Sequence, residues 1–307
     1  MRVLRHAGIR MLQAACAGLT ALSGCGSSIP LYQSMTPAME TFVSTEIPLR
    51  FDRGFPCLTL HTGADSVEVF LDTGAAQVGA GLLPGTVRSL GLKAIGRTRT
   101  LKTHSGRIRY RPVLLPEARL GGVTFRNLAC DQVDADAHPS FAGRGIMGLA
   151  LLRQFNVLID YRGSRLVLLR QASFPAGFDS SSWRRIPLTV HPDGMMIGGR
   201  PEGISKDLRW CLDTGAIALD PEGKEYYNLM KPRHFRGMAG ARERDGRVFA
   251  RLRAFRSGAV GFHPLNFLAM DFSEPGGVDG FLGADFFMKN RVLVDFAGAA
   301  LWVQPAP

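Results

Sequence analysis

From Ser44 onward, short apolar runs are separated by glycine, proline and aspartate, which is typical of an all-β protein. Residues 66–71 alternate between polar and apolar before becoming wholly apolar, and this pattern predicts a strand that enters a core. Short helices are expected within Leu82–Leu92, Leu149–Phe155 and Phe286–Lys289. The sequence therefore predicts an all-β fold with a few short helices.

The predicted core strand runs directly into an Asp-Thr-Gly string that occurs twice in the chain. Phe70-Leu71-Asp72-Thr73-Gly74-Ala75 returns as Cys211-Leu212-Asp213-Thr214-Gly215-Ala216. An Ile-Pro-Leu string precedes the first aspartate by 25 residues and the second by 27. A single Asp-Thr-Gly string would be weak support for a site, because ordinary turns favour Asp and Gly. The matched surroundings make this pair informative.

Further landmarks repeat in the same order. Gly106 lies in a turn 34 residues after Asp72, and Gly246 lies in a turn 33 residues after Asp213, so each half is expected to contain a hairpin. The strings Gly145-Ile146-Met147-Gly148 and Gly280-Phe281-Leu282-Gly283 lie 135 residues apart, and each precedes an apolar strand that ends in Asp. A period of about 140 residues is far longer than a solenoid unit, so each copy should be a lobe with its own core.

The repeat predicts the domain organisation. We expect a leader over residues 1–24, a tether over 25–44 and an N-terminal lobe over 45–170, followed by a link over 171–185 and a C-terminal lobe over 186–307.

Two aspartates in matched loops suggest acid-base chemistry. Hydrolysis of a peptide bond without a covalent intermediate needs a base that deprotonates water and an acid that protonates the departing amine. Two adjacent carboxylates that share one proton supply both. Asp72 and Asp213 are therefore the candidate catalytic pair. The alternative is that both are ordinary turn aspartates.

These motifs resemble the aspartic proteases of the pepsin and retropepsin clan, over about residues 45 to 304. The resemblance implies a bilobed fold and aspartic endopeptidase activity with Asp72 and Asp213 as the catalytic dyad. It also implies that Thr73 and Thr214 lock the two loops together by hydrogen bonds, and that the following glycines, Gly74 and Gly215, let the loops approach closely. The alanine after each loop is retropepsin-like, the single two-lobed chain is pepsin-like, and the pepsin-like tryptophan after the first loop is absent.

The neighbours of the two loops suggest how a peptide would bind. Small apolar residues at Ala75, Ala76, Ala216 and Ile217 predict apolar subsites. The hairpins at Gly106 and Gly246 would close over an extended peptide, and the peptide backbone would pair with them as an added strand does. The alternative is an ordinary exposed hairpin, and it is favoured more for the second hairpin than for the first.

The alanines also affect the expected pH dependence. Ala75 and Ala216 provide no hydroxyl donor to the carboxylates, so the charged form is less favoured and the pKa of the dyad should be higher than in pepsin. We expect a pH optimum between mildly acid and near neutral.

The beginning of the chain reads as a leader. It has an arginine-bearing start and an apolar stretch too short to span a bilayer, followed by Leu22-Ser23-Gly24-Cys25. That string resembles a bacterial lipobox, which implies cleavage before Cys25 and lipid attachment to its thiol. Gly26 in place of Asp implies the outer membrane, facing the periplasm. A plain signal peptide with an incidental cysteine is the alternative.

The formal charge is +11, and removal of the three leader arginines leaves 11 − 3 = +8. Anionic headgroups, a cell-wall polymer or acidic substrate segments could exploit this charge, and a solvated basic surface is the commoner explanation. No basic stripe interleaved with aromatic residues is present, so we do not expect nucleic-acid binding. H-E-x-x-H and G-x-S-x-G strings are absent as well, and we expect no metal or organic cofactor.

The three cysteines that follow Cys25 in the chain, Cys57, Cys130 and Cys211, are interpreted as buried thiols in preference to a Cys57–Cys130 disulfide. The expected partners are a peptide or protein substrate and, through Cys25, a membrane. The internal repeat predicts a monomeric pseudo-dimer, with a homodimer as the alternative. Two functional hypotheses stay open at this point: an aspartic endopeptidase, and a peptide-binding or scaffold lipoprotein with the same fold.

Overall fold

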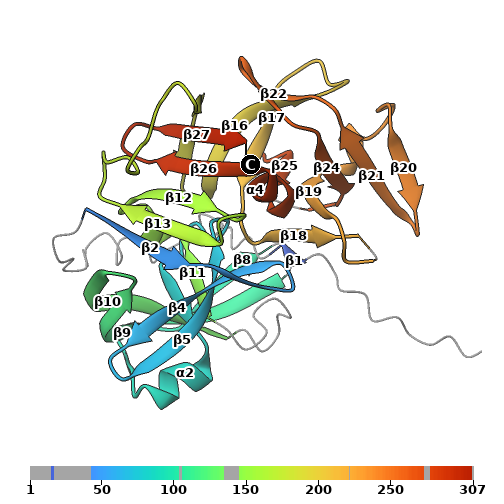
Figure 1. Cartoon of the computed structure of the whole chain (residues 1–307). Coiled ribbons are helices and arrows are strands. Elements are labelled where there is room, and N and C mark those ends of the chain that lie inside the picture. Colours follow the sequence, from blue (N-terminus) through green and yellow to red (C-terminus); the bar gives the residue numbers. More distant parts are fainter. Residues whose placement is uncertain are drawn as a thin grey trace, which may run out of the picture.

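The computed structural model describes residues 15–16, 43–103, 106–134, 145–220, 222–272 and 277–305. Strands dominate the described residues, which confirms the predicted all-β class (Figure 1). They are accompanied by three short α-helices, each overlapping a stretch where the sequence predicts one: α2 (Pro84–Ser89), α3 (Leu149–Leu152) and α4 (Ala284–Lys289). None of the described helices is long and apolar enough to cross a bilayer.

A nine-stranded sheet is formed by residues 50–148, with the order β3-β4-β5-β11-β6-β10-β9-β7 and β8 paired to β9. Its first strands are β3 (Arg50–Asp52), β4 (Phe55–Thr62), β5 (Asp65–Asp72), β6 (Ala80–Leu82) and β7 (Lys93–Ala94). The others are β8 (Arg99–Thr103), β9 (Gly106–Leu120), β10 (Val123–Asp134) and β11 (Gly145–Gly148). The strand β5 is the one predicted to enter the core, and it ends at Asp72 in the middle of the sheet.

A twelve-stranded sheet holds the second Asp-Thr-Gly string and follows the order β20-β21-β24-β19-β25-β17-β16-β22-β23, with β15, β18 and β1 paired off this path. Its strands begin with β15 (Thr189–His191), β16 (Gly194–Pro201), β17 (Leu208–Leu212), β18 (Ala216–Leu219), β19 (Tyr226–Met230) and β20 (Ala241–Arg244). They continue with β21 (Arg247–Leu252), β22 (Phe255–Ser257), β23 (Val260–Phe262), β24 (Leu265–Ala269) and β25 (Gly280–Leu282). The two-residue strand β1 (Ala15–Cys16), inside the predicted leader, pairs with β18.

A six-stranded sheet joins the two halves of the chain in the order β14-β27-β26-β12-β13-β2. Its strands are β2 (Ser44–Pro48), β12 (Asn156–Asp160), β13 (Arg165–Leu169), β14 (Arg184–Pro187), β26 (Asn290–Asp295) and β27 (Ala300–Pro305). At its centre β12 and β26 run antiparallel, and Leu158 lies opposite Leu293, its own counterpart in the repeat. Counterpart strands of the two copies of the repeat therefore face each other at this strand pair.

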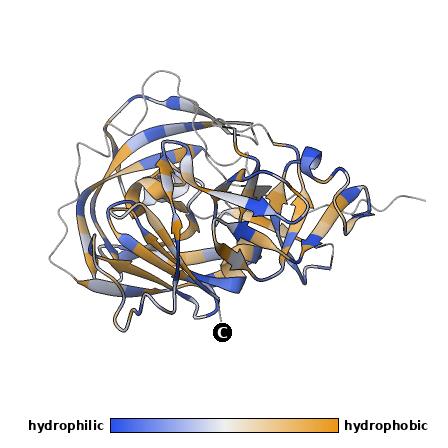
Figure 2. Cartoon of the chain, turned by 90° about the horizontal axis from the view of Figure 1, so that it is seen from above, coloured by the Kyte–Doolittle hydropathy of each residue, from blue (hydrophilic) through white to orange (hydrophobic). Residues whose placement is uncertain are grey.

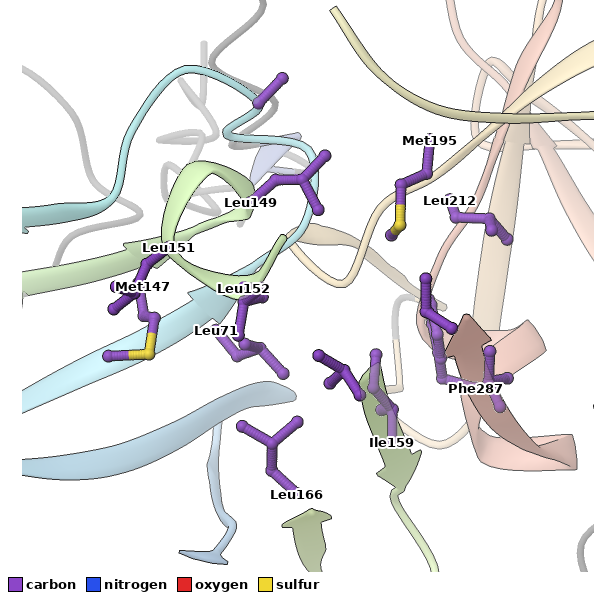
Figure 3. Packing of buried hydrophobic residues seen from close by; sticks show 14 of the residues in the cluster. Leu71, Met147, Leu149, Leu151, Leu152, Ile159, Leu166, Met195, Leu212 and Phe287 are labelled. Atoms are coloured by element: carbon purple, nitrogen blue, oxygen red, sulfur yellow. The ribbon is translucent and has the colours of Figure 1, made fainter. Parts of the chain in front are cut away.

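The core follows the alternation of hydrophobic and hydrophilic residues along the strands (Figure 2). One large apolar cluster spans both halves, and Figure 3 shows part of it, with Leu71, Leu212, Ile159 and Phe287 among its members. Three smaller clusters of described residues lie outside it, of which one contains Ala75 and another contains Ala216. Each Asp-Thr-Gly loop is therefore packed between the main core and a smaller apolar cluster of its own half.

Candidate active site

The structure brings the two Asp-Thr-Gly loops together. The backbone N–H of Thr73 donates to Thr214 Oγ1 at 2.9 Å, and the backbone N–H of Thr214 donates to Thr73 Oγ1 at 3.0 Å. Each hydroxyl in turn donates across to the carbonyl two residues before the opposite threonine, namely Leu212 O at 3.0 Å and Leu71 O at 2.9 Å. All four hydrogen bonds are buried, and they fix one loop against the other.

The two aspartates are held in the same way within their loops. Asp72 Oδ1 accepts the backbone N–H groups of Gly74 at 2.9 Å and Ala75 at 3.0 Å. Asp213 Oδ1 accepts those of Gly215 at 2.8 Å and Ala216 at 3.1 Å. Both aspartates are fully buried. One oxygen of each carboxyl is thus oriented by backbone donors.

The glycines show how close the two carboxyls lie to the opposite loop. A Cβ added to Gly74 would lie 2.6 Å from Asp213 Oδ1, and a Cβ added to Gly215 would lie 2.7 Å from Asp72 Cγ. Real Cβ atoms do not approach other heavy atoms to within 3.0 Å. Only glycine fits at these two positions, and each one leaves room for the aspartate of the opposite loop.

Electrostatics couple the two carboxyls. Burial raises the pKa of Asp72 well above its ordinary value, and the charge of Asp213 and a hydrogen bond with it raise it further. The backbone donors from Ala75 and Gly74 lower the pKa and only partly offset this effect. Two close carboxyls cannot both ionise in such a site, so the pair retains one proton to a higher pH than a free aspartate.

The repeated Gly-x-x-Gly strings lie directly behind the loops. Gly148 approaches the carbonyl of Ala75 so closely that an added Cβ would lie 2.6 Å from that oxygen, and Gly283 packs in the same way against the carbonyl of Ala216. The backbone N–H of Leu149 donates to Ala75 O at 3.0 Å. These glycines position the loops, a role that the sequence motif alone does not reveal.

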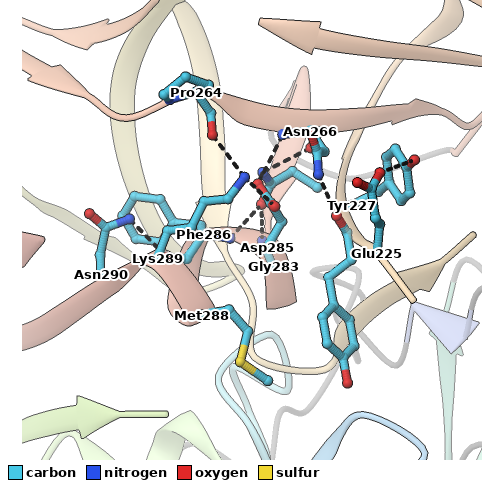
Figure 4. Close-up of polar contacts among 12 residues, drawn as sticks. Glu225, Tyr227, Pro264, Asn266, Gly283, Asp285, Phe286, Met288, Lys289 and Asn290 are labelled. Carbon is cyan, nitrogen blue, oxygen red and sulfur yellow. Dashed lines mark hydrogen bonds and ion pairs between the residues drawn. The ribbon is translucent and has the colours of Figure 1, made fainter. Parts of the chain in front are cut away.

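The second loop is supported by a network of polar side chains (Figure 4). Asn228 Oδ1 accepts the backbone N–H groups of Gly283 at 2.9 Å and Phe286 at 3.2 Å. Asn228 Nδ2 donates to Asp285 Oδ2 at 2.9 Å, and Lys289 Nζ pairs with Asp285 Oδ1 at 2.6 Å. The network links α4 to β19 and holds Gly283 against the second loop.

Replacing Asn228 by Ala should therefore destabilise the protein strongly. The change removes the acceptor of two buried N–H groups and one of the donors to Asp285, whose pKa is already raised by burial. We expect a loss of about 2–4 kcal/mol in the free energy of unfolding, measured by urea denaturation. Asn156→Ala is the matched control, because Asn156 is equally buried and its side chain makes a single hydrogen bond, to Ser173 O at 3.1 Å. Equal losses in the two variants would contradict the role of the network.

The residues predicted to contact a peptide lie around the loops. Ala75 and Ala216 each belong to a smaller apolar cluster, whereas Ala76 lies in the main core. Ile217 lies against the turn at Gly54, where an added Cβ would be 3.0 Å from Ile217 Cγ2 and 2.9 Å from Tyr226 Cε1. The first-half turn therefore packs on the second loop, next to a tyrosine that the sequence motif does not mark.

Both predicted hairpins are present. Strands β8 and β9 pair up to Thr103 opposite Gly106, and residues 104–105 at the turn lie outside the described residues. Strands β20 and β21 are joined at Asp245 and Gly246, which both have positive φ, so this is a tight two-residue turn. Their role as flaps stays a prediction.

The remaining predictions concern cysteines, metals and the leader. Cys57, Cys130 and Cys211 are buried thiols and form no disulfide in the described part of the chain, as the sequence favoured. The residues the structure describes contain no group of three or more His, Cys, Asp or Glu side chains that could hold a metal ion. Cys25 and most of the predicted tether lie outside the described residues.

Comparison with known proteins agrees with this geometry. The model of the family described as "Aspartyl protease" matches residues 59–151, which include the first Asp-Thr-Gly loop and the first Gly-x-x-Gly string. No curated protein matches the chain. The family match supports an aspartyl protease family and aspartic protease activity in general.

Proposed function

We propose that the chain is an aspartic endopeptidase in which Asp72 and Asp213 form the catalytic dyad. The observation that carries this proposal is the reciprocal bonding of Thr73 and Thr214, which brings one aspartate from each half to a single buried site. The family match covers only the first half, so the role of the second aspartate rests on the geometry. In this proposal each half is a retropepsin-like lobe, and the six-stranded sheet lies between them.

The chemistry follows from the shared proton. The ionised carboxylate takes a proton from a water molecule, whose oxygen attacks the peptide carbonyl carbon while the protonated carboxyl donates to the carbonyl oxygen. The C–N bond then breaks as one carboxyl donates a proton to the departing nitrogen, while the other carboxylate takes a proton from a hydroxyl of the tetrahedral intermediate, which becomes the new carboxyl end. The dyad ends with one proton, as it began. No metal ion or organic cofactor takes part in these steps.

The full chain should cleave peptides with an optimum between mildly acid and near neutral pH. Asp72 accepts no hydroxyl hydrogen bond from Ala75, and burial raises its pKa, so the singly protonated pair persists to a higher pH. The experiment is incubation with a diverse peptide library over about pH 3 to 8, a range that spans the expected titration of the dyad. An activity profile that peaks near pH 2 would contradict this expectation.

The alternative is a peptide-binding or scaffold lipoprotein with the same fold. Two adjacent buried carboxyls are unfavourable in a protein that only binds peptides, because their burial lowers the stability of the fold and binding does not require them. Well-folded protein that binds peptides but cleaves none, at every pH tested, would favour the alternative.

The location is a separate proposal. We propose a lipid anchor at Cys25 that holds the enzyme in the bacterial cell envelope, at the outer membrane and facing the periplasm, as a monomer. Cys25→Ala should move the protein from the membrane fraction to the soluble fraction in the producing cells. Wild-type protein that is already in the soluble fraction, like the variant, would favour the plain signal peptide.

A further inference from the structure

Tyr161 is the feature that most clearly distinguishes the surroundings of the two loops. It follows β12 directly, and the residue at the same place after β26 is Phe296, since 161 + 135 = 296. The two copies of the repeat therefore differ at this point by one hydroxyl group.

The tyrosine ring is buried among aromatic neighbours. Its side chain is 2% exposed. The centroid of its ring lies 4.9 Å from that of Phe51 and 5.4 Å from that of Phe287, so aromatic neighbours from both halves of the chain fix its direction. Burial, followed by the charges of Asp213 and Asp72, raises the pKa of Tyr161 well above its ordinary value. The hydroxyl therefore stays neutral and remains a hydrogen-bond donor.

The hydroxyl lies beside the side chain of Thr214, outside the geometry of a regular hydrogen bond. Thr214 Oγ1 donates to Leu71 O and accepts the backbone N–H of Thr73, both at 2.9 Å. A hydroxyl oxygen has two acceptor positions, so Thr214 retains one. A buried phenol without a partner costs free energy, and a small shift of the ring would satisfy both groups.

From this arrangement we propose that Tyr161 is a positioning residue for the dyad: its O–H binds Thr214 Oγ1 and makes the second loop inequivalent to the first. The inference rests on the proposed function. The positive end of the phenol dipole then points toward the second loop, where it stabilises the carboxylate form of Asp213. Asp72 consequently holds the shared proton.

The groups with the largest effect on the hydroxyl are acidic. The titratable side chains whose charge acts on it are those of Asp213, Asp72 and Tyr226. The last of these is a half-buried phenol whose own pKa is raised by burial. The Tyr161 dipole is therefore expected to act directly on the titration of the dyad.

The test compares the full chain with Tyr161→Phe, which removes only the oxygen, and with Phe296→Tyr as the matched control in the other half. Tyr161→Phe should move the acidic limb of the profile of kcat/KM against pH upward by about half a pH unit, because one ordinary hydrogen bond is lost. The melting temperature should change little, and Phe296→Tyr should leave the profile in place. An unmoved limb in Tyr161→Phe would overturn the proposal.

A second measurement separates this proposal from the proposed function. The carboxyl carbons of ¹³C-labelled aspartate report the titration of the dyad by NMR, whether or not any peptide is cut. If the wild type cleaves nothing but Tyr161→Phe shifts the titration upward, the positioning role holds and the proposed function fails. If the titration is the same in both proteins, the positioning role is wrong, whatever the cleavage assay gives.

Discussion

Asp72→Asn should abolish peptide cleavage and at the same time stabilise the folded protein at neutral pH. Removing one member of an acid-base pair costs about 10²- to 10⁴-fold in rate. The hydrogen bonds to Gly74 and Ala75 can persist, because the amide oxygen of Asn still accepts them. The substitution therefore removes the charge with little change in the loop.

The gain in stability follows from the raised pKa of Asp72. Below the ordinary carboxyl pKa of about 4, the folded and the unfolded chain are both protonated and the group costs nothing. As pH rises, the unfolded chain ionises freely while the folded chain does not, so the stability of the wild type falls. Asn does not titrate, so the advantage of the variant should be near zero at low pH and grow until the folded carboxyl ionises.

Urea denaturation of both proteins at a series of pH values, beside a cleavage assay, measures the two effects. Asp65→Asn is the control, because Asp65 is exposed at the start of β5, outside the dyad, and its replacement should change neither quantity. Asp213→Asn should lose cleavage as well. Full activity in either dyad variant would rule out a shared catalytic pair.

Gly215→Ala should inactivate the protein and destabilise it. The added Cβ would lie 2.7 Å from Asp72 Cγ and 2.8 Å from Asp72 Oδ1, so the carboxyl or the whole loop must move. Thr73 and Thr214 oppose that movement through four buried hydrogen bonds. We expect a loss on the order of 3 kcal/mol in the free energy of unfolding. A displacement of about 1 Å at the dyad should cost about 10²-fold in rate.

Gly198→Ala supplies the matched control in the same half. Gly198 lies in β16, and an added Cβ there would meet nothing within 4 Å. Its replacement should leave cleavage and stability close to those of the wild type. If Gly215→Ala were as active and as stable as Gly198→Ala, the two loops would not lie as close in solution as the structure has them.

The sequence predicted the parts of the site that are repeated. Asp72 and Asp213 can be picked out because each stands in a motif flanked by matched strands, hairpins and glycines. An internal repeat of this kind can be recognised from the sequence alone. The β5 strand and the three helices were found for a similar reason, because apolar periodicity is a local property. Both the fold class and the meeting of the loops could therefore be anticipated.

The unrepeated contacts could not be predicted in this way. Asn228 lies 57 residues before Asp285, and a single polar residue in a strand carries no signal of a partner so distant in the chain. Tyr161 is equally inconspicuous, since a tyrosine after a core strand is an ordinary packing residue. Comparing the copies position by position would have marked it, because Tyr161 stands where the second copy has Phe296.

The antiparallel pairing of β12 with β26, in which Leu158 faces Leu293, determines how the protein behaves when it is diluted. In an assembly of two separate chains, the same pairing would form only above a certain protein concentration. Here the covalent connection supplies the second copy at an effective concentration that does not depend on how much protein is present. The two loops should therefore stay assembled even in very dilute solution, and cleavage per molecule should be the same at any protein concentration.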